Sequence, residues 1–382
     1  MDERYYEEKL DLDLAKLLPQ QQQIEKVEAF RVSSPRLIGD IGLRAFLQLR
    51  RKALELVRKE AIDFVYIPIP SFYAALIGPY LHRKTGVKYG IDYIDPWVHR
   101  FPGAEKTFSR HWWSMKLAGL LEPLAIKKAS LITGVAEGYY QGVKERNPRL
   151  ERTCLFGAMP YGGEPGDHDK VRELGLKPYL FEKKEGKLQL VYAGAMLPKA
   201  YKPLEQIFRA IRANKALFRD VEFHFIGTGR TPNDPQGYNI KPLAQRFGLW
   251  HSFVFEYPAR IPYLDVLVHL EASSGTFILG STEPHYTPSK VYQAVLSSRP
   301  VLAVLHEKSQ AFGLLNRTGA GVTIGITEDN ISSLQELVPK AFGKFKEFQE
   351  SFSPGSVVKK EFEEFSAFKV TGKLVSLLNK LQ

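Results

Sequence analysis

The sequence has a single cysteine, Cys154, which excludes a disulfide framework and a thiolate metal site. A protein without disulfides is typical of a reducing compartment, so we expect this one in the cytoplasm. Its nine histidines show no metal-ligand spacing, and no metal is expected. The charged start, MDERYYEEKLDLDL, lacks the apolar core of a signal peptide.

Long apolar runs are also missing. The longest uncharged run, 64–81, is broken by prolines and a serine. It is shorter than the roughly 20 residues that a membrane-spanning helix needs. The sequence therefore predicts no membrane span.

Basic residues, by contrast, are in excess, with a net charge of +11 and a pI near 9.4. Such a charge indicates an anionic partner. Composition alone does not decide whether that partner is nucleic acid, an acidic membrane or a phosphorylated substrate. The basic residues are scattered among acidic ones, and no recognition-helix or stacking motif is present. We therefore expect no nucleic-acid binding.

Short apolar runs alternate with helical patterns, first from residue 63 and again from residue 188. This alternation predicts an α/β protein with parallel sheets built from βαβ units. We expect two Rossmann-like doubly wound domains, one over 1–170 completed by a tail helix over 355–382, the other over 171–354. The stretch 161–169, rich in Gly, Pro and Asp, is expected to be a linker.

In open parallel sheets, ligands bind beyond the carboxyl ends of the strands. Gly194 ends the first strand of the second series, and Gly227 and Gly229 follow the next. A glycine there could let backbone N–H groups approach an anion, or it could simply form a tight turn. Several cations fall in or beside the strand-end loops and could neutralise a diphosphate or be ordinary surface charges: Lys199, Lys202, Arg230, Arg260 and Lys290.

The segment TPSKVYQAVLSSRPVLAVL is the most specific of these loops. Pro288 favours a helix start and Ser289 can cap it, whereas Lys290 in the first turn opposes the helix dipole. A cation there indicates an anionic ligand. Gln293 lies one turn further on the same face, where it could bond a sugar hydroxyl. The alternative is a plain amphipathic helix.

These loops resemble those of GT-B glycosyltransferases, specifically the family 4-like (group 1) branch. The resemblance is carried by YAGAML, FHFIGTG and TPSKVYQAVLSSRPVLAVL in the second domain, and by DFVYIPIPSFYAALIGPYLHRKTGVKYGIDYIDPWV in the first. It implies two domains facing a cleft and transfer of a sugar from a nucleotide sugar to a polysaccharide or glycolipid acceptor. It also implies retention of anomeric configuration and no metal or other cofactor.

The resemblance also implies roles for single residues. Asp95 and Asp92 would be catalytic or position the acceptor, and Trp97 would shape the acceptor pocket. On the donor side, Lys199 or Lys202 and Arg230 or Arg260 would contact the diphosphate, beside Gly194, Gly227 and Gly229. Ser289 and Lys290 would contact the phosphates or sugar, and Gln293 the ribose.

Two departures from the family leave alternatives open. Gln293 replaces the second of two characteristic glutamates, and Glu283 would stand in for the first. The chain also opens without the family's first strand, glycine-rich loop and helix, so the first domain looks truncated at its N-terminus. A catalytically defective protein that binds a nucleotide or a partner is one alternative, and a UDP-sugar epimerase on the same fold is another.

The segment SRHWWSMKLAGLLEPLAIKKA combines tryptophans, leucines and lysines. This mixture is suited to peripheral contact with an anionic membrane. Alternatively, Trp112 and Trp113 belong to the core.

Overall fold

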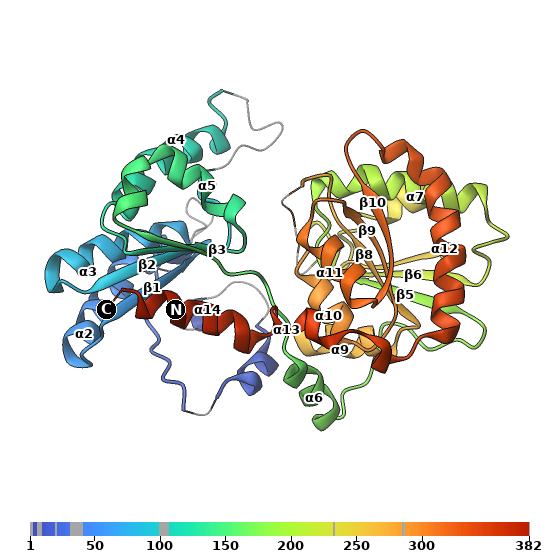
Figure 1. Ribbon diagram of the computed structural model, residues 1–382, viewed down its shortest axis with the longest axis horizontal. Helices are drawn as coiled ribbons and strands as arrows, with labels where there is room; N and C mark the ends of the chain where they lie inside the picture. Colours follow the sequence, from blue (N-terminus) through green and yellow to red (C-terminus); the bar gives the residue numbers. More distant parts are fainter. Residues whose placement is uncertain are drawn as a thin grey trace. The chain divides into compact units, whose positions relative to one another are not determined.

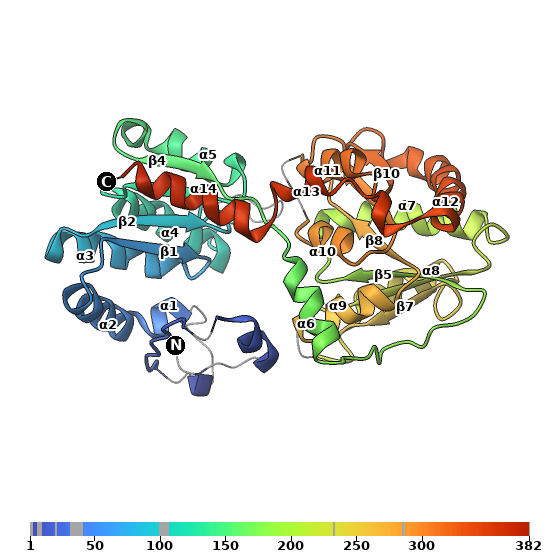
Figure 2. The same ribbon diagram turned by 60° about the horizontal axis from the view of Figure 1, so that its bottom comes forward.

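The computed structural model describes residues 3–5, 10–19, 21–30, 41–98, 107–231, 234–284, 286 and 288–381. The chain forms two units (Figures 1 and 2). The first comprises Met1–Glu7, Gln22–Tyr161 and Val370–Gln382, and the second Glu8–Gln21 and Gly162–Lys369. The boundaries thus lie at 161/162 and 369/370 rather than at the expected 170 and 354.

The first unit contains a parallel sheet in the order β1-β2-β3-β4. Each strand lies within a run that the sequence predicts. The strands follow one another across the sheet in the same order as in the sequence. Among the described residues this sheet therefore lacks the reversal of strand order that defines a doubly wound domain. The strands are β1 (Phe64–Ile69), β2 (Lys88–Tyr93), β3 (Leu131–Gly134) and β4 (Leu155–Ala158). The helices are η1 (Glu3–Tyr5), α1 (Ile41–Arg44), α2 (Phe46–Lys59), η3 (Phe72–Leu76), α3 (Ile77–Thr85), α4 (Arg110–Ile126), α5 (Glu137–Arg146) and η4 (Pro148–Arg152).

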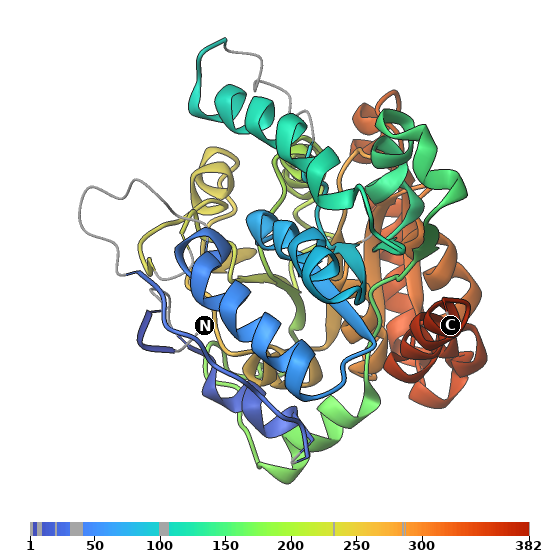
Figure 3. The ribbon, with the colours of Figure 1, turned by 90° about the vertical axis from the view of Figure 1, so that its left-hand side faces the viewer.

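Helices cover both faces of this sheet. In Figure 1, α4 and α5 lie above it and α14 (Ala367–Asn379) below it, and Figure 3 shows α2 beside α3. The Tyr89 hydroxyl donates to the Ala125 carbonyl at 2.7 Å, which ties β2 to α4. Glu122 of α4 is fully buried and accepts two hydrogen bonds from Arg146 of α5, at 3.0 and 2.6 Å. A buried carboxylate is tolerated when it is paired in this way.

The second unit contains six parallel strands in the order β10-β9-β8-β5-β6-β7. The order reverses between β5 and β8, as in a doubly wound Rossmann-like domain. The strands are β5 (Leu188–Ala193), β6 (Val221–Ile226), β7 (Val254–Tyr257), β8 (Gly275–Leu279), β9 (Val301–His306) and β10 (Gly321–Ile326). The helices are η2 (Leu12–Leu17), α6 (Pro165–Glu173), η5 (Pro198–Ala200), α7 (Tyr201–Ala213), α8 (Lys241–Arg246), α9 (Tyr263–Ala272), α10 (Lys290–Leu296), α11 (Gln310–Thr318), η6 (Ile331–Ser333), α12 (Leu334–Ser351), η7 (Pro354–Ser356) and α13 (Lys359–Glu363), with α14 crossing the unit boundary.

The stretch expected to be a linker instead starts helix α6. Pro165 takes the first helical position, and the Glu164 carboxylate accepts the Gly166 N–H at 3.2 Å. Proline at the first position of a helix costs no hydrogen bond, because that N–H has no partner within the helix. The Pro, Gly and Asp residues here therefore mark a helix start. Helix α6 packs on α9 in the second unit, which moves the boundary to 161/162.

Apolar strands form the core of the second unit. All residues of β6, β8 and β9 are buried, as expected for strands covered on both faces. Helices α7 and α12 pack against each other, and their apolar residues join Phe223, Phe225 and Phe277 in one cluster. Leu264 and Leu267 of α9 form a second cluster with Val191 and Ile226.

One polar residue of β6 should make the stability of this unit depend on pH. His224 is 2% exposed, stacks on Phe181 at 4.4 Å between ring centroids, and lies 3.4 Å from Glu222. Burial lowers the pKa of His224 to about 4, although Glu222 opposes the shift. The unfolded chain takes up this proton below the ordinary pKa of 6.5 and the folded chain does not, so acid favours unfolding.

We expect the free energy of unfolding to fall by about 1.5 kcal/mol more between pH 6.5 and 5 in the wild type than in His224→Phe. Urea denaturation at several pH values measures this difference. Phenylalanine suits the site because Phe255 and Tyr257 also stack on the ring. Parallel pH profiles of the two proteins would contradict a buried neutral His224.

Candidate functional site

The strand-order reversal in the second unit marks a candidate ligand site. Loops leave β5 and β8 in opposite directions at this point, which opens a crevice at the carboxyl edge of the sheet. A cavity of about 300 Å³ lies here. Its lining includes Ala193 at the end of β5, Tyr263 of α9, and Ser289, Lys290 and Gln293 at the start of α10. Three of the predicted donor residues thus surround one cavity.

Lys290 reaches across the end of β5. Its Nζ donates to the Tyr192 hydroxyl and to the Ala195 carbonyl oxygen, and lies 4.0 Å from the centroid of the Tyr192 ring. Gly194 leaves room for this path, because a Cβ there would lie 2.8 Å from Lys290 Cε. Desolvation lowers the pKa of Lys290 to about 7. An anionic ligand at this edge would stabilise the charged form of the amino group.

Of the two roles considered for the strand-end glycines, the structure favours the turn. Their own N–H groups are used within the backbone: Gly194 donates to Ile226 at 2.8 Å, Gly227 to Tyr257 at 2.8 Å, and Gly229 to Pro258 at 2.9 Å. What Gly194 and Gly227 provide is a left-handed backbone, with φ of 114° and 70°. Gly229 is required because a Cβ there would meet the Pro258 carbonyl oxygen at 2.6 Å.

Not all of the cations predicted at the strand-end loops are available to bind a ligand. Lys199 forms an ion pair with Glu283 at 3.3 Å, so its charge is balanced within the protein. Lys202, Arg230 and Arg260 are exposed. A Cβ on Gly227 would be 3.8 Å from the Cα of Arg260 and 3.9 Å from the Cα of Gly194, so Arg260 lies beside the ends of β5 and β6. Arg260 is therefore a candidate for a second cation near Lys290.

The TPSK loop differs from the expectation in one respect. Helix α10 begins at Lys290, but the Ser289 side chain makes no capping hydrogen bond and is exposed. Pro288 is buried, which fixes the approach to the helix. His285 and Thr287 lie outside the described residues. Ser289 thus presents an uncommitted hydroxyl to the cavity instead of stabilising the helix.

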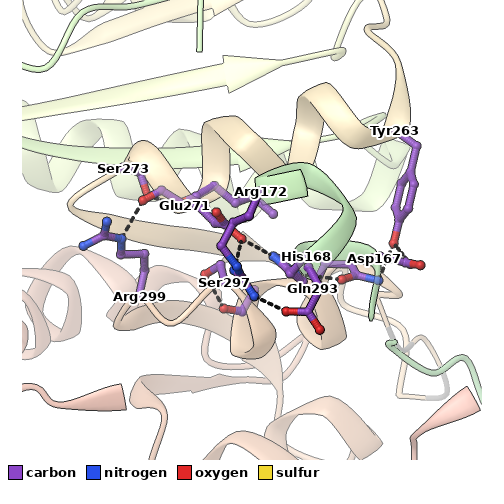
Figure 4. Close-up of polar contacts among 12 residues, drawn as sticks. Asp167, His168, Arg172, Tyr263, Glu271, Ser273, Gln293, Ser297 and Arg299 are labelled. Carbon is purple, nitrogen blue, oxygen red and sulfur yellow. Dashed lines mark hydrogen bonds and ion pairs between the residues drawn. The ribbon is translucent and has the colours of Figure 1, made fainter. Parts of the chain in front are cut away.

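Gln293 belongs to a hydrogen-bonded network that the sequence did not reveal (Figure 4). Its Oε1 lies 3.1 Å from Nε2 of His168, whose Nδ1 lies 2.7 Å from Glu271 Oε1. Its amide nitrogen donates to the Tyr263 hydroxyl at 2.5 Å, and that hydroxyl donates to Asp167 at 2.7 Å. The network links α6, α9 and α10, so it holds Gln293 in place at the cavity wall.

Glu256 of β7 organises the GTG loop, residues 227–229, which follows β6. The sequence did not identify Glu256 as a functional residue. Its carboxylate is 5% exposed and accepts from Thr228 Oγ1 at 2.8 Å. It also accepts the N–H groups of Asn239, Ile240 and Lys241, at 2.9, 2.9 and 2.8 Å. A charged acceptor at the start of α8 is favourable for the helix dipole. One buried residue thus joins the loop after β6 to the next helix.

The first-unit residues occupy different environments. Asp92 lies within β2 and accepts from Thr133 Oγ1 at 2.6 Å, and burial raises its pKa. Asp95 is exposed beyond the strand end. Trp97 is 3% exposed and stacks on Phe72 at 5.8 Å between ring centroids. The indole of Trp97 thus belongs to the core of the first unit, where it has almost no exposed surface to offer an acceptor, contrary to the expectation that it shapes the acceptor pocket.

Two features are absent from the described part of the chain. No group of three His, Cys, Asp or Glu side chains there is arranged to hold a metal ion. None of its helices has the length and apolarity that crossing a bilayer requires.

No protein-family model and no curated protein matches the sequence. Solved structures do resemble the fold. A UDP-forming α,α-trehalose-phosphate synthase from Burkholderia xenovorans is 14% identical, with a TM-score of 0.59 over 91% of this chain and 81% of that one. Anabaena HepE in complex with UDP is 15% identical, with a TM-score of 0.57 over 89% and 84%. A sucrose-phosphate synthase from Thermosynechococcus elongatus is 12% identical, with a TM-score of 0.56 over 92% and 82%. At these identities the likeness shows the fold, and the chain has the GT-B fold, with two Rossmann-like parallel-sheet units.

Proposed function

We propose that this protein is a glycosyltransferase that moves a sugar from a nucleotide sugar to a polysaccharide or glycolipid acceptor, with retention of configuration. The observation that carries the proposal is Lys290, a desolvated cation that crosses Gly194 at the strand-order reversal. A leaving diphosphate is the charge that such a group would stabilise. Anabaena HepE, which shares the fold, has been solved with UDP and with UDP-glucose, which supports a uridine diphosphate donor.

The residues divide into donor and acceptor roles in this proposal. Lys290 and Arg260 neutralise the diphosphate, Ser289 bonds its oxygens, and Gln293 contacts the ribose or sugar. Asp95, which is exposed, orients the acceptor hydroxyl. Asp92 holds the end of β2 through Thr133. These cations can balance the leaving-group charge themselves, so we propose that no metal or organic cofactor takes part. We place the reaction in the cytoplasm, in keeping with a buried free Cys154.

A nucleotide-binding protein without turnover is the second candidate. The amide of Gln293 is already used by His168 and Tyr263, so a nucleotide would have to displace one of these partners or accept a shared hydrogen bond. Such a site could bind without reaching a productive geometry. Binding and turnover must therefore be measured separately.

Thermal denaturation with UDP, GDP and a panel of their sugars tests the donor site. A nucleotide at a hundred times its Kd should stabilise the folded protein by about 2.7 kcal/mol. A product assay with the stabilising nucleotide sugar and candidate acceptors then tests turnover. Stabilisation with product supports the transferase, and stabilisation without product supports the second candidate. No stabilisation by any nucleotide would overturn both.

A further inference from the structure

Helix α4 carries an apolar stripe that no described residue covers. Trp113, Leu117, Leu120 and Leu124 are 57, 42, 71 and 56% exposed. Their spacing of four, three and four residues places them along one side of the 17-residue helix. On the opposite side, Ala118, Glu122, Ala125 and Ile126 are at most 2% exposed, so the stripe is not a consequence of a loosely packed helix. Figure 3 shows α4, in teal, along the outside of the first unit.

An aromatic cluster extends the stripe beyond the N-terminal end of α4. Phe108 is 73% exposed and has a left-handed backbone, with φ of 64°. Its ring lies 5.4 Å from that of Trp112 and 6.3 Å from that of Trp113. Exposed aromatic rings next to an apolar helix face are typical of segments that insert at a bilayer interface.

Among the described residues, the exposed charges of α4 and of the two residues that follow it have one sign. Lys116, Lys127 and Lys128 are exposed beside it, and Lys116 lies over the Trp112 ring at 5.4 Å. The only acidic residue of α4 is Glu122, which is fully buried and paired with Arg146. The exposed surface of α4 thus presents cations and apolar side chains without a compensating carboxylate.

We propose that the exposed face of α4 docks on a membrane surface rich in anionic lipid. The apolar stripe and Phe108 would enter the acyl boundary, and the three lysines would contact lipid phosphates. A second copy of the chain fits less well, because two such faces would oppose their lysines. The proposal does not depend on the proposed reaction. It would bring the chain close to a lipid-linked acceptor.

Vesicle co-sedimentation of the full-length protein tests this surface. We expect binding to vesicles of phosphatidylcholine with phosphatidylglycerol, weak binding to phosphatidylcholine alone, and release at high salt. Leu120→Ser with Leu124→Ser should weaken binding at least tenfold. The matched control is Leu47→Ser with Val375→Ser, at positions 50 and 48% exposed on α2 and α14, and it should bind like the wild type.

The lysines are tested in the same assay. Lys116→Gln, Lys127→Gln and Lys128→Gln together should weaken binding to anionic vesicles on the order of a hundredfold, at about 1 kcal/mol for each lysine. The control triple variant changes three exposed lysines elsewhere: Lys340→Gln, Lys344→Gln and Lys373→Gln. If the two triple variants bound equally weakly, the loss of net charge alone would explain the weaker binding, and the proposal that these three lysines contact the membrane would be overturned.

Tryptophan fluorescence gives a readout that does not rely on the leucine variants folding. Anionic vesicles should shift the emission to shorter wavelength in the wild type and in Trp250→Phe, and the shift should be much smaller in Trp113→Phe. Equal binding to neutral and anionic vesicles would overturn the proposal. Binding like the wild type by both the double leucine variant and the triple lysine variant of α4 would also overturn it. So would sedimentation velocity showing a dimer that Leu120→Ser with Leu124→Ser dissociates, because the occupant would then be a second copy.

Discussion

Replacing Lys290 with alanine should lower kcat/KM for the nucleotide sugar by about a hundredfold to a thousandfold, the usual cost of losing one group that stabilises developing charge. The reason is its position, since its Nζ is held at the strand-order reversal by the Ala195 carbonyl and the Tyr192 hydroxyl. The fold should tolerate the change, because the Tyr192 hydroxyl keeps its own bond to Ala195 at 3.0 Å. Lys344→Ala, at an exposed position of α12, is the matched control.

The same lysine should make nucleotide affinity depend on pH. Its pKa is lowered to about 7 by desolvation, so above pH 7 the free protein increasingly holds a neutral amine. A diphosphate favours the ammonium form, and binding at pH 8 should therefore take up a proton. Calorimetry in buffers of different ionisation enthalpy measures this uptake, which should vanish in Lys290→Ala. Affinity that is unchanged between pH 7 and 9, without proton uptake, would remove Lys290 from the diphosphate site.

Replacing Glu256 with alanine should lower the free energy of unfolding by about 3 to 5 kcal/mol, because buried donors would lose an ionised acceptor. The groups affected are the Thr228 hydroxyl and the N–H groups of residues 239–241. Nucleotide affinity should fall as well, since the GTG loop would lose its connection to α8. Urea denaturation and calorimetry measure the two effects.

Two further variants make the Glu256 prediction specific. Glu256→Gln keeps one acceptor oxygen and should be destabilised less than Glu256→Ala. Glu336→Ala, at an exposed position in the first turn of α12, should change stability by less than about 0.5 kcal/mol. If Glu256→Ala were no less stable than Glu336→Ala, the carboxylate would not organise the loop.

The strands and the strand-end residues were predictable because their signals are local. Runs such as VEFHFI and PVLAVL are apolar and β-branched or aromatic, which is the pattern of a strand covered on both faces. Gly194, Gly227 and Lys290 follow from the rule that parallel strands end at one edge of a sheet. These positions required no knowledge of which strands are neighbours.

The network around Gln293 was not predictable, because its members come from distant segments. His168 and Gln293 are separated by 125 positions, and Tyr263 and Asp167 by 96. The Pro and Gly residues near His168 indicated a linker, although Pro165 after Glu164 is also the signature of a helix start. That signature was the one local signal that could have placed His168 on a helix.

The tryptophans of the first unit show the same limit of prediction from local sequence. Trp97 follows an Asp-Pro turn and was expected at a pocket, yet it is buried, whereas Trp113 is 57% exposed. Helix α4 has apolar residues on all sides, so the periodicity of the sequence could not select its buried face. Only packing of Ala118, Ala125 and Ile126 in the core of the first unit decides which side faces outward.

The sequence by itself thus determined the α/β class, the strands and the side chains at their carboxyl ends, because hydrophobic periodicity and turn chemistry act over a few residues. The tertiary structure alone decided which of those side chains meet. Pairing of β5 with β8 creates the strand-order reversal and, with it, the crossing of Lys290 over Gly194. Burial then lowers the pKa of that lysine, and burial is a property of the packed chain, not of any local segment.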